Sequence, residues 1–127
     1  MSLQNEPTGP QSPEPDVGDA RLVESWGDGR QPCLLLHMKL TPQGASGADE
    51  AIPGTHDLLL EKVQELGGRV QIFFVTMGRY DIVAGVILPD DESAVCLAMR
   101  LAERGLVTTE TLKAFGLSVY QESVRKH

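Results

Sequence analysis

The sequence has few cysteines, few basic residues and no long apolar run, and each shortage excludes a class of protein. Its two cysteines, Cys33 and Cys96, lie in apolar segments far apart, so we expect reduced core thiols rather than a disulfide framework. The chain has 11 lysines and arginines against 18 aspartates and glutamates, and the scattered basic residues predict no nucleic-acid groove. No stretch approaches the ~20 apolar residues of a membrane span, and the N-terminus lacks a basic stretch followed by a long apolar run, so we expect neither membrane insertion nor secretion. These shortages predict an acidic, cytoplasmic protein that binds neither nucleic acid nor membrane.

The first 31 residues differ in composition from the rest of the chain. Residues 1–19 hold four of the eight prolines and almost no apolar residues, which predicts a flexible, acidic N-terminal extension. Trp26, the only tryptophan, follows this stretch. It either docks the extension onto the domain or belongs to a short peptide that binds a partner. Residues 32–127 are expected to form one domain.

From residue 32 the apolar pattern becomes regular. It predicts a strand at 32–40, a Gly- and Pro-rich loop at 41–54, a helix at 55–66 capped by Thr55, strands at 69–77 and 80–88, a helix at 91–104 capped by Asp90, a strand at 106–115, and one or two helical turns from Leu117. This order is the βαββαβ, or ferredoxin-like, plan of the α+β class. We therefore expect two helices on one face of a four-stranded antiparallel sheet.

The two hairpin strands at 69–77 and 80–88 predict that both faces of this sheet are apolar. If Gly78 and Arg79 form a two-residue type II′ turn, the residue pairs across the hairpin follow by counting. Phe73 then pairs with Ala84, and Phe74 pairs with Val83 on the opposite face. A sheet with helices on one side and water on the other alternates apolar with polar residues. We therefore expect a second copy, packed sheet to sheet as a homodimeric α/β barrel, or alternatively the Trp26 segment, to cover the second face.

Four blocks of the sequence resemble the GYD domain family. They are LGGRV (66–70), MGRYD (77–81), PDDESA (89–94) and TTETLKAF (108–115), and the family's Gly, Tyr and Asp correspond to Gly78, Tyr80 and Asp81. The resemblance covers about residues 32–116. It implies a dimeric α/β-barrel fold built on the ferredoxin-like plan, and it implies no established biochemical activity.

Four residues are candidates for ligand binding: His37, Arg79, Tyr80 and Asp81. His37 interrupts an apolar strand, and alternation places it with Lys39 on the face away from the helices, where it acts either as an acid, base or ligand or as a hydrogen-bonded interface residue. Tyr80 either packs in the dimer interface or lines a cavity. Asp81 either bonds to the turn or joins a site, and Arg79 either holds an anionic group or is solvated.

Two functions fit this pattern. One is a small-molecule-binding protein, either a ligand sensor or a small enzyme, with its site in the barrel. The other is a non-catalytic protein-interaction module that displays the acidic extension with Trp26. We assign no catalytic residue, and the spacing of His37 and His56 predicts no metal site. No motif identifies a cofactor.

Overall fold

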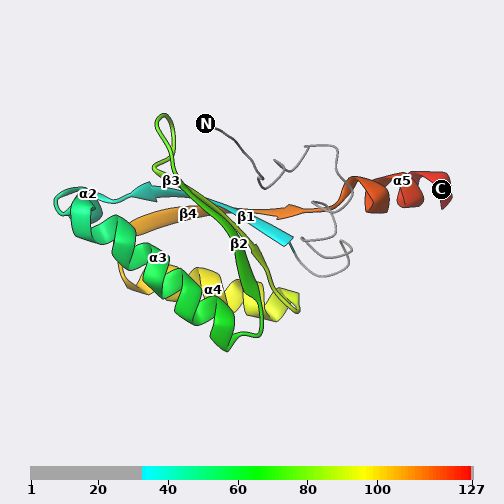
Figure 1. The fold of residues 1–127 in the computed structure, drawn as a ribbon, viewed down its shortest axis with the longest axis horizontal. Helices are drawn as coiled ribbons and strands as arrows, with labels where there is room; N and C mark the ends of the chain where they lie inside the picture. Colours follow the sequence, from blue (N-terminus) through cyan, green and yellow to red (C-terminus); the bar gives the residue numbers. More distant parts are fainter. Residues whose placement is uncertain (1–32, 127) are drawn as a thin grey trace, which may run out of the picture.

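The computed structural model describes residues 33–126. Figure 1 shows a sheet with two long helices on one side and a further helix beyond its end. The elements in chain order are β1 (Cys33–Leu40), α2 (Pro42–Ala45), α3 (Ala48–Glu65), β2 (Arg69–Val75), β3 (Ile82–Ile87), α4 (Asp91–Glu103), β4 (Val107–Ala114) and α5 (Leu117–Lys126). The predicted βαββαβ order is confirmed, with α2 and α5 added to it.

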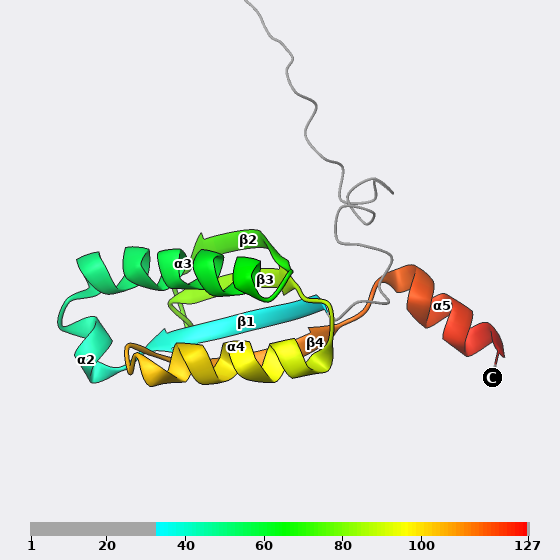
Figure 2. The ribbon, with the colours of Figure 1, turned by 90° about the horizontal axis from the view of Figure 1, so that it is seen from below.

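The four strands form one antiparallel sheet in the order β2-β3-β1-β4. In this order the two halves of the chain interleave, because β1 lies between β3 and β4. Figure 2 shows α3 and α4 running along the strands on the same side of the sheet. The domain is therefore an α+β, ferredoxin-like fold of two layers, as the sequence predicts.

Alternation along β1 decides which side chains face the helices. The core between sheet and helices contains Leu34, Leu36, Met38, Leu59, Val63, Ile82, Ala84, Val86, Leu88, Leu97, Leu101 and Val107. Burial of each large apolar side chain stabilises the fold by about 1.5–3 kcal/mol. The intervening residues of β1, which include His37 and Lys39, consequently point to the other face, as expected.

Helix α3 begins seven residues earlier than the sequence predicts. It starts at Ala48, so the expected loop at 41–54 is wrong and Thr55 is not a cap. The Thr55 hydroxyl instead donates to the carbonyl oxygen of Ala51 at 2.8 Å inside the helix. Ala51, Thr55, Leu59 and Val63 are all buried at a four-residue spacing. Burial of this stripe therefore outweighs the unfavourable helix propensities of the proline and glycine at 53–54.

Helix α4 begins where the sequence predicts and ends one residue earlier, at Glu103. Asp90 is the N-cap, and its carboxylate accepts from the backbone N–H of Ser93 at 2.8 Å. The hydrogen bonds from Ser93 lower the pKa of Asp90 below its ordinary value. After the helix, Gly105 has a φ of +72°, which glycine adopts at low cost.

The pairing of β2 with β3 follows the predicted register only near the hairpin. Phe73 pairs with Ala84 and Phe74 with Val83, as expected. Between Val70 and Ile72 the register shifts, so that Val70 pairs with Val86, whereas counting back from a two-residue turn would pair it with Ile87. A β-bulge of this kind inserts one extra residue into one strand. It returns Val70 to the helix side of the sheet, where it packs against the core.

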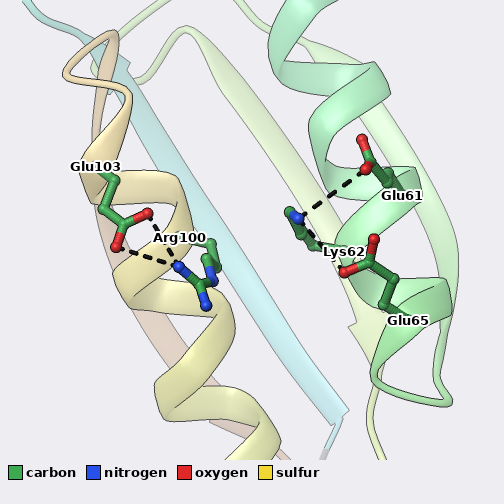
Figure 3. A network of polar contacts seen from close by, with 5 residues as sticks. All are labelled: Glu61, Lys62, Glu65, Arg100 and Glu103. Carbon is green, nitrogen blue, oxygen red and sulfur yellow. Dashed lines mark hydrogen bonds and ion pairs between the residues drawn. The ribbon is translucent and has the colours of Figure 1, made fainter.

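The helices carry ion pairs between neighbouring turns. Figure 3 shows the Arg100 guanidinium next to the Glu103 carboxylate on α4, and Lys62 between Glu61 and Glu65 on α3. The closest N–O distances are 3.2 Å for Arg100 to Glu103 and 3.3 Å for Lys62 to Glu65. Such exposed pairs contribute little stability, typically about 0–1 kcal/mol. They mark these helix surfaces as solvated.

Candidate functional site

Three polar side chains converge on the face of the sheet that the helices leave open. His37 lies in β1, and its cross-strand neighbours are Glu110 in β4 and Val83 in β3. The ring of Tyr80 lies 4.8 Å from the ring of His37, centroid to centroid, with the ring planes tilted by 51°. The Tyr80 hydroxyl donates a hydrogen bond to the Glu110 carboxylate. We call His37, Tyr80 and Glu110 the open-face cluster.

The connection between β2 and β3 places Tyr80 in this cluster. The expected two-residue type II′ turn is wrong, because the strands end at Val75 and Ile82 and leave a six-residue loop. Gly78 has a φ of +139°, far from the value of about +60° that a type II′ turn requires. The Thr76 hydroxyl donates to the carbonyl oxygen of Tyr80 at 2.8 Å inside this loop. Figure 1 shows the loop rising on the side of the sheet opposite α3 and α4.

Asp81 fastens the loop to the end of β1. Its backbone N–H donates to the carbonyl oxygen of Met38 at 2.9 Å, and its Oδ2 accepts from the backbone N–H of Leu40 at 2.8 Å. Asp81 also accepts, through its carbonyl oxygen, the backbone N–H of Thr76 across the hairpin. Hydrogen bonds to both neighbouring strands therefore hold this connection, and no tight turn is needed. The carboxylate of Asp81 is therefore engaged by backbone, and this residue positions the loop instead of joining the cluster.

Two cationic residues lie at the rim of the cluster. The Lys39 ammonium donates to the backbone carbonyl of Arg79 at 3.5 Å, and both side chains are exposed. The charge of Arg79 lowers the pKa of Tyr80, which opposes the effect of Glu110. Arg79 therefore acts on the cluster electrostatically from the loop.

The environment of Tyr80 keeps its hydroxyl protonated. The hydrogen bond to Glu110 is the main cause that raises the pKa of Tyr80 above its ordinary value of 10.0. Partial loss of hydration and the negative charge of Glu110 raise it further. Tyr80 therefore remains a hydrogen-bond donor at neutral pH, next to the imidazole ring of His37.

The cluster is surrounded by apolar side chains of the same face. Phe74 is 57% exposed and Leu112 is 40% exposed, although both are large and apolar. Half-buried apolar side chains of this face include Leu35, Ile72 and Val83. A few polar groups set in an apolar surface are typical of sites for small molecules.

A family model for the GYD domain matches residues 34–124. The chain belongs to the GYD domain family. The match confirms the resemblance seen in the sequence and extends it beyond β4 into α5. No match to the chain is found among curated proteins or solved structures.

In this GYD domain, two of the four residues predicted for the site come together and two do not. His37 and Tyr80 are in ring contact, whereas Arg79 lies at the rim and Asp81 bonds to backbone. Sequence reasoning missed Glu110. The sequence pattern could have identified it, since alternation along β4 places Glu110 on the other face of the sheet from Thr109 and Thr111. The ferredoxin-like order also sets β4 beside β1, which carries His37.

The remaining sequence candidates lie elsewhere or outside the described residues. His56 of the GYD domain packs edge to face on Phe73 with ring centroids 4.7 Å apart, on the side of the helices. Within residues 33–126, no three His, Cys, Asp or Glu residues form a group that could hold a metal ion. The same range contains no helix that is long and apolar enough to cross a membrane. Trp26 and the N-terminal extension lie outside the described residues.

Proposed function

We propose that two copies of this GYD domain pack sheet to sheet, and that the enclosed face binds a small, largely apolar molecule through the open-face cluster. The observation that carries the proposal is the position of His37, Tyr80 and Glu110. They meet on a largely apolar face that no helix of residues 33–126 covers. Polar groups that converge in an apolar setting orient a ligand, and a purely structural sheet face has no need of them.

The apolar character of the open face favours a second sheet as its cover. Exposed Phe74 and Leu112 would each remain in contact with water in a single copy. Removing apolar surface from water stabilises an assembly by about 25 cal/mol per Å². Two copies related by a twofold axis bring the same surface of each chain together, so one apolar face covers the other.

The cluster defines the chemistry of the ligand. Tyr80 is a protonated donor, Glu110 is an acceptor, and the His37 ring offers either role. The surrounding side chains, such as Phe74 and Leu35, offer only apolar contact. A compact molecule with an aromatic or aliphatic body and one carbonyl or hydroxyl group matches this arrangement.

The proposal is tested by native mass spectrometry of the full chain as purified from cells. We expect a dimer that carries an additional small-molecule mass. His37→Ala and Tyr80→Phe should keep the dimer and lower the occupancy of that molecule by about tenfold, since each removes a contact of the cluster. Met99→Ala, which alters an exposed side chain on α4, is the matched control and should retain it.

Two results contradict the proposal separately. A monomer at every protein concentration refutes the sheet-to-sheet dimer. A dimer that carries no small molecule, or whose bound molecule is unaffected by both cluster substitutions, refutes the binding site and leaves the assembly intact.

A further inference from the structure

Strand β4 lies at one edge of the sheet, and no strand of residues 33–126 pairs with its outer side. Such an edge offers a row of backbone N–H and C=O groups to a further strand. The other edge strand, β2, is interrupted by the bulge between Val70 and Ile72, and bulges discourage pairing at an edge. β4 instead pairs with β1 in one unbroken register over all eight of its residues and contains no proline. The outer side of β4 is therefore the regular, unprotected edge of this sheet.

One hydrogen bond shows which backbone groups of β4 point outward. Directly before β4, the carbonyl oxygen of Leu106 accepts from the backbone N–H of Thr41, beside β1, at 3.0 Å. The backbone groups of successive residues in an antiparallel strand point alternately to its two sides. Every second residue after Leu106 therefore bonds to β1, and the residues between them present both N–H and C=O to the open edge. These outward-pointing residues are Val107, Thr109, Thr111 and Lys113.

A second copy of β4 fits this edge in one register. A twofold axis perpendicular to the sheet brings the same edge of two chains together as antiparallel strands. The midpoint of β4 falls between Glu110 and Thr111, so the overlap is longest with the axis at either residue. An axis at Glu110 sets two carboxylates directly opposite each other, which is destabilising. An axis at Thr111 pairs two threonines, sets Lys113 opposite the partner's Thr109 and opposes no like charges.

Phe115 is an exposed aromatic residue directly after β4. It is 61% exposed, and its ring centroid lies 5.9 Å from the ammonium of Lys113. The same ammonium bonds to the carboxylate of Asp91 in α4 at 3.0 Å, so Lys113 lies on the helix side of the sheet. Alternation along the strand places Phe115 on that side as well.

The register with the axis at Thr111 sets Phe115 opposite the partner's Val107. On each chain a groove of about 390 Å³ opens beside Val107, between β4 and α4. Its walls include Ala98 and Ala102, whose small, exposed side chains leave room for an aromatic ring. The register that pairs the backbone edges thus also brings an exposed ring to a groove, at both ends of the joined strands.

We propose that β4 pairs with β4 of a second chain about a twofold axis at Thr111, and that Phe115 of each chain fills the groove beside Val107 of the other. This contact goes beyond the proposed sheet-to-sheet dimer and is compatible with it. Stacked sheets lie about 10 Å apart and hydrogen-bonded strands about 4.8 Å apart, so a stacked sheet does not bond to the edge of β4. Both contacts together make a tetramer. Because one strand edge offers less surface than a whole sheet face, dimers associate into tetramers as the protein concentration rises.

A cysteine on the twofold axis tests the register. Full-length chains carry Cys33→Ala and Cys96→Ala, since the native thiols would otherwise compete, and are oxidised mildly. Thr111→Cys should cross-link two identical chains, because residues of a hydrogen-bonded pair have Cα atoms about 5.5 Å apart, within disulfide range. Thr109→Cys is the matched control on the same face of β4. Its two copies would lie about 13 Å apart along the strands, so it should cross-link at least tenfold more slowly.

Two substitutions test the contact without a cross-link, in native mass spectrometry over a series of protein concentrations. Thr111→Pro removes an outward N–H that β1 does not use, and proline is tolerated at such edge positions. It should raise the Kd of the tetramer at least tenfold, whereas Thr111→Val keeps the N–H and should leave this Kd unchanged. Phe115→Ala should also raise it at least tenfold. Its control is Val75→Ala, which shortens a 63% exposed side chain on β2 at the other edge of the sheet.

The outcomes separate this inference from the proposed sheet-to-sheet dimer. A chain that stays a dimer at every concentration, with or without Thr111→Pro, overturns the edge contact and leaves the sheet-to-sheet dimer intact. A dimer that Thr111→Pro converts to a monomer supports the edge contact and refutes the sheet-to-sheet dimer. Equal cross-linking of the Thr111→Cys and Thr109→Cys chains, or faster cross-linking of the latter, overturns the register. A tetramer whose Kd is unchanged by both Thr111→Pro and Phe115→Ala also overturns the inference.

Discussion

Replacing Asp81 by alanine tests whether this residue holds the hairpin loop rather than a ligand. Its Oδ2 accepts the backbone N–H of Leu40 at 2.8 Å in a half-buried position, and alanine leaves that donor without its partner. A hydrogen bond to a charged group contributes about 1.5–3 kcal/mol, and an unsatisfied buried donor costs about 1–3 kcal/mol. Because this site is only half buried, we expect the free energy of unfolding to fall by about 1–2 kcal/mol. For a domain of this size, that loss lowers the melting temperature by about 5–15 °C.

Asp81→Asn is the matched control for this prediction. Its amide oxygen still accepts from Leu40, so less than half of the destabilisation should remain. Urea unfolding at one fixed protein concentration measures both variants, because a dimer makes stability depend on concentration. Amide hydrogen exchange at Leu40 reports the contact directly and should accelerate in the alanine variant alone. If Asp81→Ala leaves both the unfolding free energy and the Leu40 exchange rate unchanged, the structural role of Asp81 is refuted.

Two further substitutions have clear expected results. Glu110→Gln removes the negative charge and weakens the hydrogen-bond acceptor that raise the pKa of Tyr80, so this pKa should fall toward 10.0. Absorbance titration measures it in a chain whose other tyrosine is replaced by phenylalanine. An unchanged pKa would contradict the hydrogen bond. Gly44→Ala should cost about 1–3 kcal/mol in urea unfolding, because its Cβ would overlap the carbonyl oxygen of Leu106. Gly54→Ala, at an open helical position, should instead gain up to about 1 kcal/mol, and equal stabilities of the two variants would contradict this account.

Local patterns in the sequence predicted the bounds of a helix correctly where the cap, the apolar periodicity and the helix-ending residue agreed with one another. Helix α4 has a cap at Asp90, apolar periodicity and a glycine after its end, and its bounds were predicted within one residue. Helix α3 lacks this agreement, because the proline and glycine at 53–54 indicate a loop within a helical pattern. Packing decides that conflict, since the buried stripe that begins at Ala51 continues through them. A contact between distant elements cannot be read from the propensity of single residues.

The candidate site likewise combines features that the local sequence pattern predicts with features that depend on contacts between distant elements. Alternation alone placed His37 on the open face, and strand order would have added Glu110 to it. The loop geometry was not predictable by counting, because Asp81 bonds to Met38 and Leu40 in a strand some forty residues away. Tyr80 consequently lies beside His37 of β1.

The Gly-Tyr-Asp triplet that names the family has three separable tasks in this chain. Gly78 allows the backbone a φ of +139°, Asp81 bonds the loop to β1, and Tyr80 is thereby delivered to the ring of His37. Loss of Asp81 should therefore weaken both the fold and the cluster, whereas Tyr80→Phe should alter the cluster and leave stability almost unchanged, because the hydroxyl bonds to an exposed carboxylate. Tyr80 and Asp81 are neighbours in sequence but have different roles: Asp81 positions the loop, and Tyr80 is available to a ligand.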